Sequence, residues 1–381
     1  MTATGDIRNV VLLGHSGSGK TSLAEAILHT TGAVNRLGSV EDKTTVSDFY
    51  DEEKEHQHSI LSAVVHAEHG GKLINVIDTP GAPDFVGPAI AALPAAETAV
   101  VVISASAGIE TNTRKLFGLA SDRNKPRMIA INKMDADNVE FAELIGQIQE
   151  TFGTQCRCAN LPAADKKSVV DCIQNDSGDS PAMDVAQAHT DLLESVIEAD
   201  DALMERYLGG EEVSADQVAG VFVKAMMAGT IVPIVFTDAK GEVGIKEMLD
   251  LIVQYTPSPT QIEPAKLVEG ENTTELKADA SAPLAGVVFR VAFDPRSNMK
   301  YSTIRLFSGT LKSDTNLMYN AERKSLRPGH ILKPQGGETN EVEAGVAGDI
   351  VMLAKIEELS IGDLIHSGQV SGTFEMPAIP G

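Results

Sequence analysis

The stretch VVLLGHSGSGKT at residues 10–21 decides the fold of this chain. It joins an apolar run to the pattern G-x-x-x-x-G-K-[ST], and SLAEAIL at residues 22–28 predicts a helix directly after it. A strand, a glycine-rich turn and a helix in this order predict a phosphate-binding P-loop. Backbone N–H groups of such a turn converge on a phosphate, and the helix N-terminus adds partial positive charge. We therefore expect Lys20 to reach the β- and γ-phosphates of a nucleotide, and the Thr21 hydroxyl to bind Mg²⁺.

A second motif follows the apolar run LINVI at residues 73–77, which ends in Asp78-Thr79-Pro80-Gly81. A carboxylate at the end of a buried strand beside the phosphate loop can hold Mg²⁺ through water, which is the role expected for Asp78. The N–H of Gly81 can approach a γ-phosphate, so a loop at this position can respond when that phosphate is lost. Taken alone, the tetrapeptide is equally an ordinary turn. Its position after a strand favours nucleotide binding.

A third motif, Asn132-Lys133-Met134-Asp135, follows the apolar run RMIAI at residues 127–131. The carboxylate of Asp135 can accept hydrogen bonds from the ring N–H and the exocyclic amine of guanine, whereas adenine would leave it unpaired. Asn132 can tie this loop to the phosphate loop, and the stem of Lys133 can lie along the base. The three motifs in this order predict binding of GTP and GDP rather than ATP.

With these three motifs in this order, the chain resembles the translational GTPases, and most closely the elongation factor G family. IVPIVFTDA at residues 231–239 stands where that family has its last guanine-contacting loop, and residues 244–259 resemble its closing helix and its exit from the G domain. PLAGVVFR at residues 283–290, RLFSGTL at residues 305–311, and the pieces at residues 347–350 and 362–363 resemble its second domain, a β-barrel. The resemblance implies a GTPase that acts on the ribosome through rRNA and ribosomal proteins.

The motifs and the resemblance together give an expected site, in which Lys20 and Gly81 act at the reacting phosphate and Thr21, Ser59 and Asp78 hold Mg²⁺. The expected nucleotide-binding residues are Gly14, His15, Ser16, Gly17, Ser18, Gly19, Lys20, Thr21, Ser22, Asp78, Asn132, Lys133, Asp135, Thr237, Asp238 and Ala239.

The chain departs from the family pattern at three places. The family has a His after Asp-Thr-Pro-Gly that positions the attacking water, but this chain has Ala82, whose methyl group cannot orient water. In the segment EHQHSI at residues 55–60, Ser59 stands where the family has a Mg²⁺-binding Thr, and His56-Gln57-His58 precede it in place of the usual Arg-Gly. The last guanine loop reads Thr237-Asp238 where Ser-Ala is usual. The first departure predicts slow hydrolysis, whereas none of them affects the phosphate loop or Asp135.

The organisation along the chain predicts an α/β fold in two main parts. Residues 1–260 are expected to form a P-loop GTPase domain with a parallel sheet and an α/β insert at about 153–229. A polar linker is expected at residues 261–282, since it follows Pro257-Ser258-Pro259. Short alternating runs with Gly turns over residues 283–370 predict an antiparallel β-barrel. Residues 371–381 read as the start of a linker to further domains.

Composition sets broad limits on the function. The chain has 381 residues and 43% hydrophobic residues, which is enough for two or three domains with proper cores. No run approaches 18 apolar residues, and the first strand begins too early for a signal peptide, so we expect a cytoplasmic protein without a membrane partner. The net charge of −23 is unfavourable for nucleic-acid binding in general, and no DNA partner is expected. The acidic stretch at residues 176–212 is either a solvated surface or a face for basic ribosomal proteins.

Cysteines and histidines give weaker indications. Three cysteines, Cys156, Cys158 and Cys172, form neither a disulfide framework nor a usual zinc spacing, and we interpret them as free thiols. Four histidines between residues 56 and 69 raise the alternative of a metal site, which their irregular spacing does not favour.

The sequence thus predicts a monomeric GTP-dependent switch on the ribosome, using GTP, GDP and Mg²⁺, with hydrolysis slowed by Ala82. Three alternatives stay open. One is a ribosome-protection or release-factor-type GTPase, which would share the same two domains. Another is a non-hydrolysing, GTP-bound regulatory module. The third is a structural protein with a vestigial site, which would bind no GTP.

Overall fold

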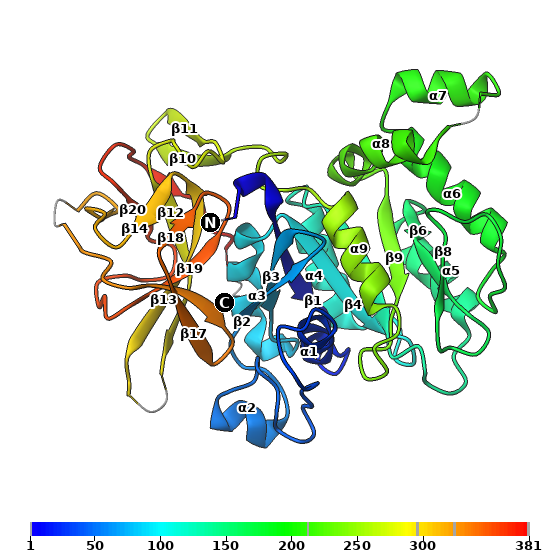
Figure 1. Cartoon of the computed structure of the whole chain (residues 1–381), viewed down its shortest axis with the longest axis horizontal. Helices are drawn as coiled ribbons and strands as arrows, with labels where there is room; N and C mark the ends of the chain where they lie inside the picture. The colour runs from blue at the N-terminus through cyan, green and yellow to red at the C-terminus, as the bar shows by residue number, and fades with distance from the viewer. Residues whose placement is uncertain (1, 212, 295–296, 323–324, 379–381) are drawn as a thin grey trace.

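The computed structural model describes residues 2–211, 213–294, 297–322 and 325–378. In this part of the chain a seven-stranded sheet with the order β2-β3-β1-β4-β5-β9-β6 forms the centre of the molecule (Figure 1). Its strands are β1 (Ile7–Leu13), β2 (Ala63–His69), β3 (Lys72–Asp78), β4 (Thr98–Ser104), β5 (Arg127–Asn132), β6 (Cys156–Cys158) and β9 (Val232–Phe236). Neighbouring strands pair in parallel, except that β2 runs antiparallel to β3. The predicted parallel-sheet GTPase fold is confirmed.

Helices cover both faces of this sheet, which explains why its central strands are buried and mostly apolar. Along β1, Val11 and Leu13 face one core and Val10 and Leu12 the other. The first core is closed by α3 (Val86–Ala92), α4 (Thr111–Ser121) and α5 (Phe141–Phe152), and the second by α1 (Lys20–Thr30), α8 (Ala215–Ala228) and α9 (Ile245–Tyr255). Since every side chain of β1 is buried, the phosphate loop that follows it has a rigid base.

The insert at about residues 153–229 contributes one strand to the main sheet, which its sequence does not indicate. It contains β7 (Asn160–Pro162), β8 (Val169–Asp171), α6 (Val185–Ile197), α7 (Asp201–Leu208) and α8. The N-terminus of α8 is capped, because the Ser214 hydroxyl accepts a hydrogen bond from the Gln217 N–H. However, β6, which also lies within residues 153–229, pairs with β9 and extends the main sheet. Three residues are too short a run to predict a strand, so only tertiary pairing defines β6.

The second part of the chain is an antiparallel barrel, as predicted. In the described residues its larger sheet has the order β15-β20-β12-β13-β19-β16-β17, and β14 pairs with β18. The strands are β12 (Ala285–Phe293), β13 (Lys300–Ser308), β14 (Thr310–Lys312), β15 (Met318–Tyr319), β16 (Ile331–Gln335), β17 (Glu338–Val342), β18 (Ala344–Val346), β19 (Ile350–Ala354) and β20 (Leu364–His366). Alternate residues point inward, so that Val288, Ile304, Leu306 and Val351 form a core separate from those of the central sheet.

The linker expected at residues 261–282 needs a correction. It contains a hairpin of β10 (Ala265–Glu269) and β11 (Asn272–Leu276), whose buried Leu267 and Leu276 pack against Val287 and Phe307 of the barrel. The segment looks like a linker in the sequence because most of its other side chains are exposed and polar. The segment expected to be a linker at residues 371–381 also contains regular structure, since β21 (Thr373–Phe374) pairs with β10. Residues 379–381 lie outside the described part of the chain.

The two parts meet in a buried polar seam at the end of the central sheet opposite the phosphate loop. Arg305 of β13 donates to the carboxylate of Glu97 and to the carbonyl of Gly348, and both charged side chains are 2% exposed. The amide of Asn9 donates to Glu97 Oε2 at 2.6 Å and to Gly348 O at 2.9 Å. A second ion pair joins Lys333 to Asp349 beside it. Buried charges require such partners, so the seam specifies how the two parts are joined.

Among the described helices, none has the length and apolar character needed to cross a bilayer.

Candidate functional site

The phosphate loop lies between β1 and α1, as the sequence predicts. Lys20 begins α1, and its ammonium group donates to the carbonyls of Gly14 (3.0 Å) and His15 (2.9 Å). Gly19 has φ +93°, and a Cβ there would clash with the side chain of Asn132. Glycine is therefore required at this position by both backbone conformation and space. A loop of this kind presents backbone N–H groups to an anion. In this loop the N–H of His15 donates to Thr113 Oγ1 at 3.3 Å and that of Ser18 donates to His15 O at 3.3 Å.

Oxygen-bearing side chains gather at the start of α1 from three separate segments. Thr21 Oγ1 donates to Asp78 Oδ2 at 2.7 Å and lies 3.3 Å from Ser59 Oγ. Ser59 in turn donates to Asp48 Oδ1 at 2.7 Å. The structure thus brings together all three expected Mg²⁺ ligands and adds Asp48, which sequence reasoning missed. No local pattern marks Asp48, because only the path of the following residues brings it to the site.

The donor set fits a divalent cation. Asp78 is 1% exposed, and among the described residues no hydrogen-bond donor reaches its buried Oδ1 atom. Burial, and next the nearby charge of Asp48, raise the pKa of the Asp78 carboxyl. An uncompensated buried carboxylate is costly, and a hard cation held by carboxylate and hydroxyl oxygens would remove that cost.

The expected guanine loops meet the phosphate loop from the other side. The Asn132 amide lies 3.3 Å from Ser18 O, and the Asn132 Oδ1 accepts from the Ala239 N–H at 3.0 Å. Lys133 has φ +62° and its ammonium donates to Gly17 O at 2.7 Å. Asn132 therefore links its own loop to the phosphate loop and to the last guanine loop, each more than 100 residues away in the sequence.

The side chains of the last guanine loop have separate roles. Thr237 is fully buried, with its hydroxyl 3.4 Å from Asn132 Oδ1. Asp238 accepts from the N–H groups of Lys240 (3.1 Å) and Gly241 (3.0 Å), so its carboxylate shapes its own loop. Burial, and in smaller part the charge of Asp135, raise the pKa of the Asp238 carboxyl. Asp135 is exposed and free to face a base.

The loop after Asp78 lies directly on the phosphate loop. A Cβ at Gly81 would clash with Lys20 Nζ and with the Ser16 backbone nitrogen, so only glycine fits. The Gly81 carbonyl accepts from the buried amide of Asn112 at 2.8 Å, a contact from α4 that sequence reasoning also missed. Ala82 follows at a partly exposed position and presents only a methyl group.

A cavity of about 210 Å³ lies among these groups. Its lining includes Ser16, Lys20, Thr21, Asp48, His58, Ser59, Gly81, Lys133 and Lys240. The histidines near residue 60 do not form a common cluster, because His69 pairs with Asp250 at 2.6 Å while His66 faces the barrel. Within the described residues, no group of three His, Cys, Asp or Glu side chains is arranged to hold a metal ion.

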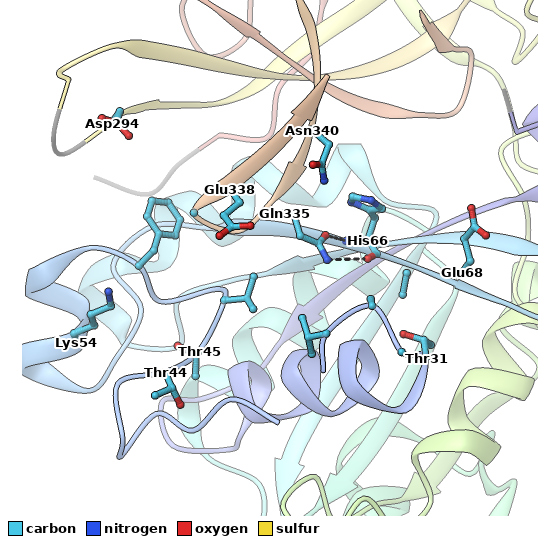
Figure 2. Close-up of a pocket in the computed structure, with 17 residues that line it drawn as sticks. Thr31, Thr44, Thr45, Lys54, His66, Glu68, Asp294, Gln335, Glu338 and Asn340 are labelled. Atoms are coloured by element: carbon cyan, nitrogen blue, oxygen red, sulfur yellow. Dashed lines mark hydrogen bonds between the residues drawn. The ribbon is translucent and has the colours of Figure 1, made fainter. Parts of the chain in front are cut away.

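A larger cavity of about 870 Å³ separates the central domain from the barrel (Figure 2). One wall includes Val46, Phe49 and Lys54. These residues belong to residues 46–59, which we call the switch segment and which contains α2 (Asp51–His56). The opposite wall includes β16 and β17, and Gln335 joins them to β2 by accepting from the His66 N–H at 2.8 Å. The Gly337 N–H between these strands donates to Val46 O at 3.2 Å, and the Tyr50 hydroxyl donates to Phe293 O at 3.0 Å. The switch segment therefore contacts both the barrel and the cluster of Thr21, Asp48, Ser59 and Asp78, which we call the candidate cation site.

Comparison with known proteins agrees with this geometry. Residues 5–258 match the family model described as the elongation factor Tu GTP binding domain, and residues 300–366 match elongation factor Tu domain 2. The chain belongs to the translational GTPases. A crystal structure of a protein from Thermus thermophilus is similar to this GTPase at 30% identity and a TM-score of 0.84. That similarity covers 96% of this chain and 55% of the other, so the translational GTPase described here spans about half the length of its relative.

Glu25 anchors the switch segment of this translational GTPase to α1, and it makes stability depend on pH. Its Oε1 accepts from the N–H groups of Val46 (2.8 Å) and Ser47 (3.4 Å). Burial raises the pKa of Glu25 from 4.5 to about 7. The folded state then holds a proton that the unfolded chain has lost, so the free energy of unfolding decreases as pH rises from 4.5 to about 7.

We expect Glu25→Gln to remove up to about 3 kcal/mol of this pH dependence, because the amide keeps the acceptor oxygen but has no charge to desolvate. Urea unfolding of both proteins between pH 5 and 8 measures the difference. Glu68→Gln, at an exposed position of β2, is the matched control. Parallel stability curves for wild type and Glu25→Gln would contradict the expectation.

Proposed function

We propose that this protein is an elongation factor G-like, GTP-dependent switch that acts on the ribosome. The observation that supports this most directly is the path of the switch segment. Its Asp48 and Ser59 lie at the candidate cation site, while its Val46 and Tyr50 touch the barrel. A change at the phosphates can therefore reach the barrel through one short segment.

The residues take the following roles in this proposal. Lys20 and the phosphate-loop N–H groups bind the β- and γ-phosphates, and Asp135 with the Asn132 loop selects guanine. Thr21, Ser59 and Asp78 would hold Mg²⁺, with Asp48 behind Ser59. When bound, Mg²⁺ neutralises phosphate charge. Loss of the γ-phosphate would release Ser59 on one side and the Gly81 loop on the other.

Hydrolysis is proposed to be slow because Ala82 cannot orient water. We expect Ala82→His to raise ribosome-stimulated turnover on the order of 10²-fold or more, since a placed imidazole contributes about this much to proton-transfer chemistry. Phosphate release with and without ribosomes measures the effect. Ala82→Leu controls for bulk and is expected to give no gain. Equal turnover of wild type and Ala82→His would contradict the role given to this position.

Calorimetry with GTP, GDP and ATP, each with Mg²⁺, tests the binding part of the proposal. We expect GTP and GDP to bind and ATP to bind at least about 10³-fold more weakly, because adenine leaves the Asp135 carboxylate unpaired. Equal affinity for GTP and ATP would overturn it. Cosedimentation with ribosomes in the presence of a non-hydrolysable GTP analogue tests the partner, and absence from the ribosome pellet would contradict that part.

Ala82 also favours a second candidate, a GTP-bound regulatory module that does not hydrolyse its nucleotide. A single-turnover experiment separates the two. Release of phosphate in the presence of ribosomes supports the enzyme, whereas stable bound GTP supports the module. A ribosome-protection or release-type GTPase would share every feature above.

A further inference from the structure

We propose that His58 orients the water molecule that attacks the γ-phosphate of GTP. The inference rests on the proposed GTPase function and assigns a residue to its chemical step. It assigns to the switch segment, upstream of Ser59, the weaker water positioning that remains when the loop after Asp78 carries Ala82, so Ala82→His is still expected to raise turnover above that of wild type.

The position of His58 is the first support. It lines the same cavity as Lys20 and Gly81, the two groups expected beside the γ-phosphate. Its imidazole stacks on the ring of Phe85, with 6.0 Å between ring centroids and 27° between the ring planes. Phe85 belongs to the segment that continues from Gly81 and Ala82. His58 therefore joins the two segments that would enclose the phosphate, and its partly buried ring is held against one of them.

The hydrogen bonding of the ring is the second support. His58 Nδ1 lies 3.0 Å from the backbone carbonyl oxygen of His56. A carbonyl oxygen only accepts, so Nδ1 must carry the hydrogen and donate. In the neutral ring Nε2 then keeps its lone pair and can accept a hydrogen bond from water. The carbonyl of His56 thus sets the tautomer that this role requires.

Most of the other polar side chains that line the cavity either have no acceptor atom or are hydrogen-bonded elsewhere. The ammonium groups of Lys20, Lys133 and Lys240 have no acceptor atom. Thr21, Asp48 and Ser59 bond to one another or to Asp78 at the candidate cation site, and Glu41 pairs with Lys240 at 2.7 Å.

Three more lining side chains carry an acceptor. Gln57 has an exposed side chain, so packing does not fix its amide in place as it does the ring of His58; its backbone is in the left-handed region at φ +55°. Ser16 and Ser22 belong to the phosphate loop and the start of α1, where they lie beside bound phosphates rather than beyond the γ-phosphate. Among the side chains that line the cavity, His58 combines an available acceptor with a ring that contacts Phe85, the ring of His56 and the His56 carbonyl.

The step itself is a hydrolysis in which the imidazole is neither consumed nor charged. The water oxygen forms a bond to the γ-phosphorus, and the bond from that phosphorus to the β–γ bridging oxygen breaks. The electron pair of the broken bond stays on the GDP β-phosphate, and a water proton passes to an oxygen of the released phosphate. His58 contributes by holding the water in line through Nε2, which is a positioning role.

The test compares His58→Ala, His58→Gln and the control His330→Ala on ribosomes. We expect His58→Ala to lower kcat for GTP hydrolysis at least about tenfold while KM changes less than twofold. His58→Gln is expected to keep most of the rate, because the amide oxygen can also accept from water. His330→Ala, at an exposed position outside the lining of this cavity, is expected to match wild type. In a His58→Ala background, adding Ala82→His is expected to restore turnover.

A readout independent of turnover uses ¹⁵N-histidine spectra of the GDP-bound protein, in which the His58 signal is assigned by its loss in His58→Gln. We expect the Nδ1–H tautomer, and a shift of the Nε2 resonance when aluminium fluoride and ribosomes complete a transition-state analogue. GDP affinity of each variant confirms that it is folded. A kcat of His58→Ala equal to that of wild type, or the Nε2–H tautomer, would overturn the role of His58 while leaving the GTPase proposal intact. No hydrolysis by wild type would overturn the catalytic part of both, whereas failure to bind GTP would overturn the proposed function first.

Discussion

Replacement of Asp135 by asparagine is expected to weaken GTP binding by about 10²- to 10⁴-fold. The carboxylate would accept two hydrogen bonds from guanine, and a bond to a charged group contributes about 1.5–3 kcal/mol. The Asn132 loop is held by Ala239 and by the phosphate loop, so its backbone is expected to stay in place when the Asp135 side chain changes. Calorimetry with GTP and Mg²⁺ measures the loss.

The same variant is expected to gain affinity for a different nucleotide, and this gain distinguishes a loss of guanine recognition from a loss of folding. Xanthine has a carbonyl where guanine has its exocyclic amine, and the amide of an asparagine can donate to that carbonyl. We therefore expect Asp135→Asn to bind xanthosine triphosphate more tightly than wild type does. Asp137→Asn, an exposed carboxylate two residues further on, is the matched control. Weak binding of both nucleotides by a folded Asp135→Asn protein would argue against direct guanine recognition by this residue.

Replacement of Arg305 by methionine is expected to lower the free energy of unfolding by about 3–5 kcal/mol. Arg305 is the charged partner of Glu97 across the seam. Its removal leaves a buried carboxylate whose remaining side-chain donor, among the described residues, is the Asn9 amide. The same change removes the bond to Gly348 O, so the contact between the barrel and the central sheet is weakened directly. Urea unfolding followed by circular dichroism measures the loss.

Two further variants make this prediction specific. Arg305→Met combined with Glu97→Gln removes both charges, and we expect it to recover much of the lost stability because no buried carboxylate remains. Arg327→Met, at an exposed position of the barrel, is expected to change stability by less than about 0.5 kcal/mol. If the free energy of unfolding of Arg305→Met equals that of Arg327→Met, the seam does not depend on the pair of Arg305 and Glu97.

The parts of the site that the sequence predicted are those built by local backbone. The phosphate loop follows a fully buried strand and precedes a helix, and each of these elements has its own pattern within about ten residues. Asn132 and Asp135 are equally local, since they follow β5 directly. Parallel strands bring their carboxyl ends to one edge, which explains why these separate motifs meet.

The parts that could not be predicted depend on contacts between distant segments. Asp48 reaches Ser59 at the candidate cation site because Glu25 and the barrel both hold the switch segment. Asn112 reaches Gly81 only through the packing of α4. The β10–β11 hairpin looks like a linker because only Leu267 and Leu276 of its side chains are buried, against a surface that the local sequence does not describe.

The sequence by itself determined the nucleotide class and the family, because short motifs carry their binding groups in the backbone turns that they encode. It also showed at Ala82 that an expected water-positioning group is missing. Only the tertiary structure decided which side chains surround the phosphate site and which charges join the two domains. His58 meets Phe85 and Glu97 meets Arg305 across 27 and 208 residues, and such pairs are selected by burial and packing of the whole fold rather than by any local pattern.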